Sequence, residues 1–192
     1  MILEGLVTTT DAAGGLHVAA MGPEFDEAER AAGRIERLVL KPFASSHTAA
    51  HLAGLPEGVF QVTDDVLLLA RIVTGTLAAA PPAVPATAVR GWVLTDAARA
   101  WEFVVESADT SGERARLVAR VVAEHAGRPF LGFNRAAHAV VEGSILVSRL
   151  HLLGAAEVAR RLADLAPLVE KTGGDRERRA FALLESRVVA GP

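Results

Sequence analysis

The strongest constraint on the fold is an alternation of apolar and polar residues on both sides of a turn at residues 109–112. Before the turn, apolar residues at positions 101, 103 and 105 alternate with Glu102 and Glu106. After it, apolar residues at every second position from 115 to 123 alternate mainly with arginine. This period of two predicts an antiparallel hairpin with one face in solvent. Glu106 is expected to face Arg114, a cross-strand pair that contributes about 0.2–1 kcal/mol.

Shorter segments with strand composition precede this hairpin. Residues 5–10 are rich in Val and Thr, residues 11–15 have turn composition, and residues 17–21 return as a second strand. Further strands are predicted at residues 35–40 and 58–63. Three prolines between residues 78 and 88 predict an irregular connection there.

Helical signals are short in the first half of the chain and dominate its end. Helices are predicted at residues 23–33 and 45–52, and from a cap at Asp64 or Asp65 to about residue 74. From residue 134 the apolar period becomes helical, which predicts helices at residues 134–152, 155–171 and 175–189. Pro167 is expected to kink or shorten the second of these. Strands first and helices last favour an antiparallel barrel at residues 1–130 with a helical region at residues 131–192 packed on it.

Composition excludes several classes of function. Hydrophobic residues make up 51% of the chain, which is enough for a buried core, and the absence of cysteine excludes disulfides and thiolate zinc sites. The N-terminus lacks the pattern of a signal peptide, and the apolar run at residues 66–70 is too short to span a bilayer. The net charge of −3 gives no reason to expect nucleic-acid binding. We therefore expect a cytoplasmic protein that binds neither membranes nor nucleic acid.

The first candidate site is the segment 41–48, in which a cation ends a strand and hydroxyl residues open a short helix. Free backbone N–H groups at a helix start favour an anion, and the hydroxyls of Ser45, Ser46 and Thr48 add donors beside Lys41. His47 or His51 could add another charge. The segment could therefore cradle a phosphate, or Ser45 and Ser46 could simply cap the helix. From the residues alone, the capping interpretation is preferred.

The second candidate site is the predicted helix start at residue 134. Asn134 is a natural cap, and Arg135, His138, Glu142 and Arg149 share one helical face. That face could point at a ligand, or it could be a solvent-facing stripe with a His138–Glu142 pair.

The other polar candidates give weaker signals. His17 and His151 have apolar neighbours and are interpreted as structural. His47 and His51 lie at i and i+4 but lack the pattern of a zinc site, and no serine lies in a GxSxG elbow.

Several segments, taken in order, resemble a family of uncharacterised FMN-binding split-barrel proteins. The matching segments are residues 3–10, 19–23, 41–43 with 46–48, 62–65, and 132–135 with His138. The resemblance implies a six-stranded Greek-key split β-barrel, similar to flavin reductases and pyridoxamine-phosphate oxidase-like proteins. It also implies a homodimer with the flavin at the subunit interface. Two residues depart from the pattern, because the family more often has arginine at the position of Lys41 and asparagine at that of His51.

The resemblance also implies which residues bind FMN. Lys41, Ser45, Ser46 and Thr48 would meet its phosphate. The backbone near Met21, Gly22 and Phe43 would lie against the ring or the ribityl chain. The site would be closed by a third group at the start of the helix predicted from residue 134, namely Asn134, Arg135 and His138.

Three functions agree with this resemblance. The first is an FMN-dependent oxidoreductase acting on a flavin, pterin or similar small molecule, with His138 as a candidate proton donor and a possible link to pterin one-carbon metabolism. The second is a flavin-binding carrier, sensor or assembly module without catalysis. The third is a helical interaction protein with an empty barrel. A deazaflavin is an alternative to FMN as the bound ring.

Overall fold

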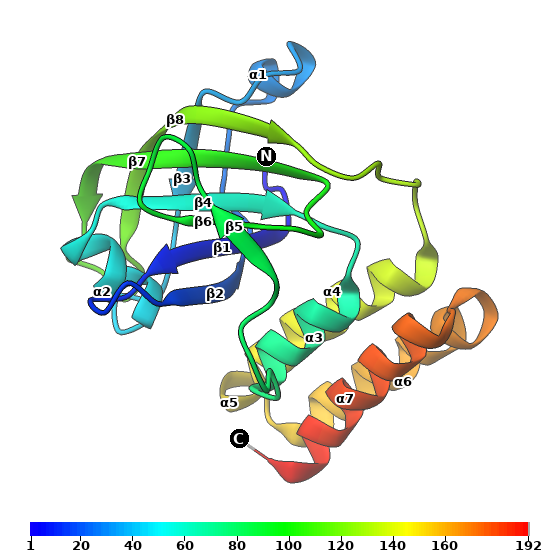
Figure 1. Cartoon of the computed structure of the whole chain (residues 1–192). Helices are drawn as coiled ribbons and strands as arrows, with labels where there is room; N and C mark the ends of the chain where they lie inside the picture. Colours follow the sequence, from blue (N-terminus) through cyan, green and yellow to red (C-terminus); the bar gives the residue numbers. More distant parts are fainter. Residues whose placement is uncertain (192) are drawn as a thin grey trace. The chain divides into compact units, whose positions relative to one another are not determined.

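The computed structural model describes residues 1–191, with the side chain of Arg30 left out. It divides into two compact units (Figure 1). The barrel unit comprises Met1–Thr63 and Ala80–Pro129, and the helical unit comprises Asp64–Ala79 and the chain from Phe130 onward. The helical unit therefore includes residues 64–79, which the sequence analysis had assigned to the barrel region. In the described part of the chain, no helix is long and apolar enough to cross a membrane.

A six-stranded antiparallel sheet forms the barrel unit, with strand order β2-β1-β4-β7-β8-β3. Its strands are β1 (Gly5–Thr10), β2 (Leu16–Met21), β3 (Arg37–Leu40), β4 (Glu57–Val62), β7 (Arg99–Asp109) and β8 (Arg116–Ala126). Glu24, which follows β2, exchanges backbone hydrogen bonds of 2.9 and 2.8 Å with Val39 of the opposite edge strand β3. The two edges of the sheet therefore meet, and the predicted six-stranded split barrel is confirmed.

Alternating side chains from these strands fill the interior of the barrel. Phe60 of β4 and Phe103 of β7 are fully buried, and Phe60 stacks on Trp101 with 5.6 Å between ring centroids. Full burial of one such side chain contributes about 1.5–3 kcal/mol. Two short helices complete this part of the fold, namely α1 (Glu27–Ala31) and α2 (His47–Gly54).

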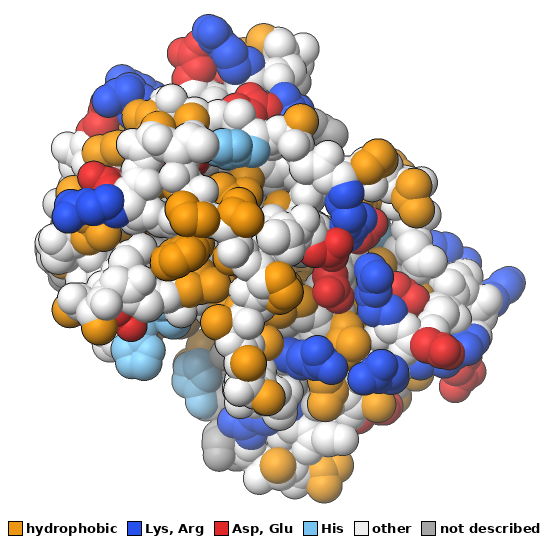
Figure 2. Space-filling view, viewed as in Figure 1, with side chains coloured by type: hydrophobic (Ala, Val, Ile, Leu, Met, Phe, Trp, Pro, Cys, Tyr) orange, Lys and Arg blue, Asp and Glu red, His pale blue; other side chains and the backbone are white. Residues whose placement is uncertain are grey.

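The helical unit buries a separate apolar core. Its helices are α3 (Val66–Thr74), α4 (Arg135–Ser148), α5 (Leu150–Leu153), α6 (Ala155–Thr172) and α7 (Asp175–Ala190). Val140 of α4, Leu162 of α6 and Leu184 of α7 are almost fully buried in this core. Figure 2 shows Lys or Arg and Asp or Glu side chains on the face of this unit that is in view, and Arg160 and Arg161 of α6 both pair with Glu157.

The predicted hairpin forms as β7 and β8, but two details of the prediction are wrong. Glu106 pairs with Arg120 at 2.9 Å rather than with Arg114, because the turn is longer than predicted and places Asp109 opposite Arg116. A β-bulge between Val105 and Ser107 also shifts the register by one residue. Glu102 does not face solvent, because it is fully buried. Strand alternation describes only the local chain, and here a distant loop covers the outer face of β7.

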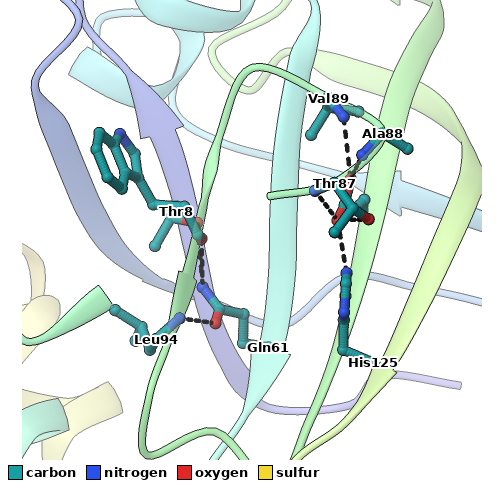
Figure 3. A network of polar contacts seen from close by, with 9 residues as sticks. Thr8, Gln61, Thr87, Ala88, Val89, Leu94 and His125 are labelled. Atoms are coloured by element: carbon teal, nitrogen blue, oxygen red, sulfur yellow. Dashed lines mark hydrogen bonds and ion pairs between the residues drawn. The ribbon is translucent and has the colours of Figure 1, made fainter. Parts of the chain in front are cut away.

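The loop that covers Glu102 lies in the predicted irregular connection. Part of the predicted connection at residues 78–88 is instead a strand, β5 (Ala83–Pro85), which pairs with β6 (Trp92–Leu94) in a two-stranded sheet. Between these strands the chain turns over β7, and the Glu102 carboxylate accepts hydrogen bonds from the amides of Thr87, Ala88 and Val89 at 2.6–3.0 Å (Figure 3). His125 of β8 lies 2.5 Å from the same carboxylate.

A second buried polar side chain fixes β6. The Gln61 amide accepts a hydrogen bond from the Leu94 amide at 2.6 Å and donates to the Thr8 hydroxyl at 3.0 Å (Figure 3). Gln61 is fully buried, so these bonds remove the cost of leaving its polar atoms without partners. Gln61 and Glu102 together tie the 80–94 segment to the barrel.

Pro167 does not shorten α6, which continues from Ala155 to Thr172 through the proline. Pro167 is exposed. Because proline has no N–H, the carbonyl group four residues earlier lacks its helical donor, and at this exposed position it can bond to water. Val158 and Val169 are buried on either side of the proline, and this packing favours one continuous helix.

Candidate functional site

The backbone of the segment 41–46 is held in place against the start of β8. The Ala115 amide donates to the Pro42 carbonyl, and the Ala44 amide donates to the Glu113 carbonyl, both at 2.9 Å. The guanidinium group of Arg114 lies 3.9 Å from the centre of the Phe43 ring. These contacts fix the point at which α2 begins.

Ser46 is the N-cap of α2, and its hydroxyl oxygen accepts a hydrogen bond from the Ala49 amide at 3.2 Å. The predicted helix and the capping interpretation are therefore both confirmed. Capping does not exclude an anion, because a hydroxyl that accepts one hydrogen bond can still donate another. The amides of His47 and Thr48 precede the first residue that can bond within the helix, so they point outward from its positive end.

Three histidines gather beside α2: His47 begins the helix, His51 lies in its last turn, and His17 belongs to β2. His47 and His51 lie one turn apart on the helix, with 6.2 Å between their ring centroids. His17 of β2 stands edge-on to both, at 5.7 Å from His47 and 5.0 Å from His51. We call these three residues the histidine cluster. Figure 2, viewed as Figure 1, shows histidine atoms at the surface beside the α2 end of the barrel.

Two buried hydroxyl groups contact the histidine cluster. The Thr48 hydroxyl lies 3.4 Å from Nε2 of His17, and the Thr9 hydroxyl lies 3.1 Å from Nδ1 of His51. Thr48 is 3% exposed and Thr9 is 1% exposed. The cluster thus comes from β2 and α2, and β1 contributes the Thr9 hydroxyl that contacts it.

The electrostatics at His17 disfavour the charged form of this side chain. Burial lowers the pKa of His17, and the neighbouring His51 and His47 lower it further, while Asp11 opposes the shift. The pKa of Asp11 is itself lowered, chiefly by hydrogen bonds from the amides of Gly15 and Ala13. Within the described residues, no group of three or more histidine, aspartate or glutamate side chains is arranged to hold a metal ion.

The apolar neighbours of His17 predict a structural role and give no sign of its place in this cluster. The signal that could have found it is the register of the first hairpin, in which His17 lies opposite Thr9. Directly opposed residues of an antiparallel pair project to the same face, so His17 projects beside the Thr9 hydroxyl that contacts His51.

Lys41, the predicted phosphate cation, is engaged by another side chain. Its ammonium group lies 2.5 Å from the Glu24 carboxylate, and both side chains are about two-fifths exposed. Glu24 therefore offsets much of the charge that Lys41 brings to the segment. A phosphate contact by Lys41 stays a prediction, as do those by Ser45, Ser46 and Thr48.

Met21 and Gly22 lie at the end of β2, where Met21 pairs with Gly5 of β1. A side chain at position 22 would approach Ile2 to 2.6 Å and Glu4 to 2.8 Å. Packing of the N-terminal segment therefore accounts for the glycine without a ligand. The predicted flavin contacts of Met21, Gly22 and Phe43 stay predictions.

The second predicted group lies in the helical unit. Asn134 caps α4, because its side-chain oxygen accepts from the Ala137 amide at 3.0 Å, and its amide group donates to the Thr172 carbonyl at 3.2 Å. Arg135 and His138 are exposed, and the His138 ring contacts the Phe133 ring edge-on at 5.7 Å. The ligand roles of Asn134, Arg135 and His138 stay predictions.

The comparisons with solved structures define the class of fold. An FMN-bound protein from Methanosarcina mazei matches 97% of this chain and 94% of its own, with a TM-score of 0.78 and 21% identity. The nitrilotriacetate monooxygenase component B from Bacillus cereus matches 65% of this chain and 69% of its own, with a TM-score of 0.52 and 16% identity. An FMN-binding protein from Thermus thermophilus matches 68% of this chain and 75% of its own, with a TM-score of 0.51 and 13% identity. The barrel unit therefore has the flavin reductase-like split-barrel fold.

Family models give the particular assignment. The N-terminal domain of the family described as protein of unknown function (DUF447) matches residues 3–128, and the family's C-terminal model matches residues 134–186. The chain belongs to this DUF447 family. The Methanosarcina mazei protein carries the same family assignment. No curated protein is similar to this chain in sequence.

Proposed function

We propose that this protein binds FMN, with the flavin phosphate at the start of α2. The observation that carries the proposal is the set of groups found there: outward-pointing helix amides, the Ser46 and Thr48 hydroxyls and the histidine cluster. Together these groups suit a phosphate monoester, which needs hydrogen-bond donors and positive charge. The related protein from Methanosarcina mazei supports the proposal, since that structure is described as FMN-bound.

The residues that hold the phosphate belong to elements with fixed backbones. The hydrogen bonds of Pro42 and Ala44 to the start of β8 set the entry into α2, and Thr48 is buried against His17. A site on such elements is preorganised and loses little conformational freedom when a ligand binds.

A double variant tests the proposed phosphate site. Ser46→Ala with Thr48→Val removes two hydroxyl groups at the start of α2, so the Kd for FMN should rise roughly tenfold or more. Titration of flavin fluorescence measures it, and circular dichroism verifies that the barrel remains folded. Ser111→Ala in the β7–β8 loop is the matched control, since Ser111 contacts Asp109 instead. An unchanged Kd in the double variant would refute the site.

We further propose that the protein is an oxidoreductase that uses the bound flavin. FMN supplies the redox chemistry when bound, and the protein supplies binding, orientation and electrostatics. Anaerobic addition of NADH or NADPH to the FMN-loaded protein should bleach the flavin absorption. If neither nucleotide bleaches it, the protein is better described as a flavin-binding module.

His138→Gln should reduce turnover if His138 donates a proton, and unchanged turnover would exclude that role.

We also propose that the protein is a homodimer. Three apolar side chains next to the start of α4 are strongly exposed, namely Phe130 at 52%, Leu131 at 91% and Phe133 at 89%. Exposed apolar groups of this kind commonly mark protein interfaces. Light scattering after size-exclusion chromatography should give twice the mass of one chain, and a monomer would exclude the dimer.

A further inference from the structure

The histidine cluster, already part of the proposed FMN site, has features that point to a coupling with protons. Its residues come from two elements separated in sequence, and all three rings lie within 6.2 Å of one another. Packing alone rarely collects three ionisable rings, because each proton that binds to one ring disfavours protonation of the others. The arrangement suits a ligand that supplies the missing negative charge.

We propose that His17, His47 and His51 form the anion-binding element of the site, which receives the phosphate monoester of the flavin nucleotide and takes up a proton from solvent as it does so. This inference rests on the proposed FMN function and adds to it a pH dependence and a selection for phosphorylated flavin. The histidines add a charge that depends on pH to the helix amides and hydroxyl groups of the proposed site.

The position of the cluster supports binding of an anion. His47 is the first residue of α2 and lies where the helix dipole is positive. The Thr48 hydroxyl lies beside His17, so a donor and two or more imidazoles are near the same helix end. Lys41 is already paired with Glu24 and Arg114 lies on the Phe43 ring, so the histidines are the groups that can bring additional charge here by taking up a proton.

The coupling to protons follows from the charges around the cluster. The charged groups that act on His17 are His51, His47 and Asp11. Burial and the two histidines favour the neutral form of His17, and Asp11 alone favours the charged form. A phosphate dianion close to these rings adds the opposite field, which raises their affinity for a proton. Binding of the dianion and binding of a proton therefore strengthen each other.

The pH range of the effect is set by both partners. The second pKa of a phosphate monoester is about 6. Above about pH 7 the ligand is thus already a dianion, so any further loss of affinity must come from the protein. If one proton is fully coupled, the Kd for FMN rises by up to tenfold for each pH unit between about 7 and 8. Riboflavin, which lacks the phosphate, should bind with a Kd that is independent of pH in this range.

The decisive experiment is isothermal titration of the full chain with FMN in two buffers of different ionisation enthalpy. A difference in the apparent enthalpy measures proton uptake directly, and riboflavin in the same buffers is the ligand control. We expect net proton uptake with FMN and none with riboflavin. FMN binding with no proton uptake and a constant Kd would overturn the histidine proposal while the FMN function stands. No FMN binding at any pH would overturn both.

Variants assign the coupling to the cluster. His47→Asn is the first choice, because His47 is exposed and its loss leaves the barrel core intact. It should reduce both the proton uptake and the pH dependence of the Kd, and the double variant with His51→Asn, which leaves only His17, should reduce them further. His151→Asn, an exposed histidine of α5, is the matched control and should behave as the wild type. Undiminished proton uptake in the folded double variant would overturn the proposal.

Discussion

At the scale of single residues, the buried carboxylate of Glu102 determines how a long loop lies on the barrel. It accepts hydrogen bonds from three consecutive backbone amides, from the Thr87 hydroxyl and from His125. Burial alone would raise the pKa of Glu102, but the hydrogen bonds outweigh burial and lower the pKa below its ordinary value of 4.5. The charged form is therefore the form that the folded state stabilises.

Replacing this carboxylate should destabilise the protein in a pH-dependent way. Glu102→Gln leaves backbone amides without an ionic acceptor, so the free energy of unfolding should fall by about 1–3 kcal/mol at neutral pH. Because the folded pKa is depressed, the stabilisation is present above 4.5, the ordinary value, and is lost as the pH falls further. Urea denaturation at several pH values should show the wild type and the variant converging in acid.

A second carboxylate on the same strand is the control for Glu102. Glu106 is partly exposed and pairs with Arg120, so Glu106→Gln should cost at most about 1 kcal/mol. Equal losses for the two variants would contradict the structural role assigned to Glu102.

At the scale of elements, α3 depends on a specific cap. The Asp65 carboxylate accepts hydrogen bonds from the amides of Leu67 and Leu68, both at 3.1 Å, whereas Asp64 lies 3.7 Å from Arg176. The sequence could not choose between these two aspartates, and the structure assigns the cap to Asp65.

Removing the cap should weaken the helical unit. Asp65→Ala leaves two helix amides without their acceptor, so the unfolding free energy should drop by about 0.5–2 kcal/mol. Asp64→Ala removes the 3.7 Å ion pair with Arg176 and should change the unfolding free energy by less than about 1 kcal/mol. Chemical denaturation followed by circular dichroism measures both variants. A larger loss for Asp64→Ala than for Asp65→Ala would contradict the assignment of the cap.

Elements with a strong local signal could be predicted from the sequence, whereas those fixed by distant contacts could not. β1 occupies the predicted residues 5–10, because Val and Thr between turn residues favour a strand wherever the segment lies. β5 was missed, because Pro85 suggests irregular chain and yet is tolerated in a two-stranded sheet, where every strand is an edge. The burial of Glu102 depends on a loop from another part of the chain, which no local pattern reveals.

The candidate site shows the same division. The cap at Ser46 and the helix after it follow from neighbouring residues, so the sequence located them. The histidine cluster depends on how β2 lies relative to α2, so His17 and His51 could not be placed together from spacing alone.

At the scale of the whole molecule, flavin binding should stabilise the barrel. A ligand that binds only the folded state adds about 2.7 kcal/mol when its concentration is one hundred times its Kd. For a chain of this size, that corresponds to a rise of roughly 5–10 °C in unfolding temperature. Differential scanning calorimetry with FMN, with riboflavin as the control ligand, measures it. Equal shifts with both ligands would show that the phosphate contributes nothing.

The central claim is that this DUF447 protein binds FMN, and equilibrium titration of the purified, flavin-free chain tests it most directly. FMN fluorescence should change saturably at one flavin per chain, and riboflavin should bind more weakly because it lacks the phosphate that α2 is proposed to hold. FMN fluorescence that stays unchanged at every protein concentration, from a sample that circular dichroism shows to be folded, would contradict the claim.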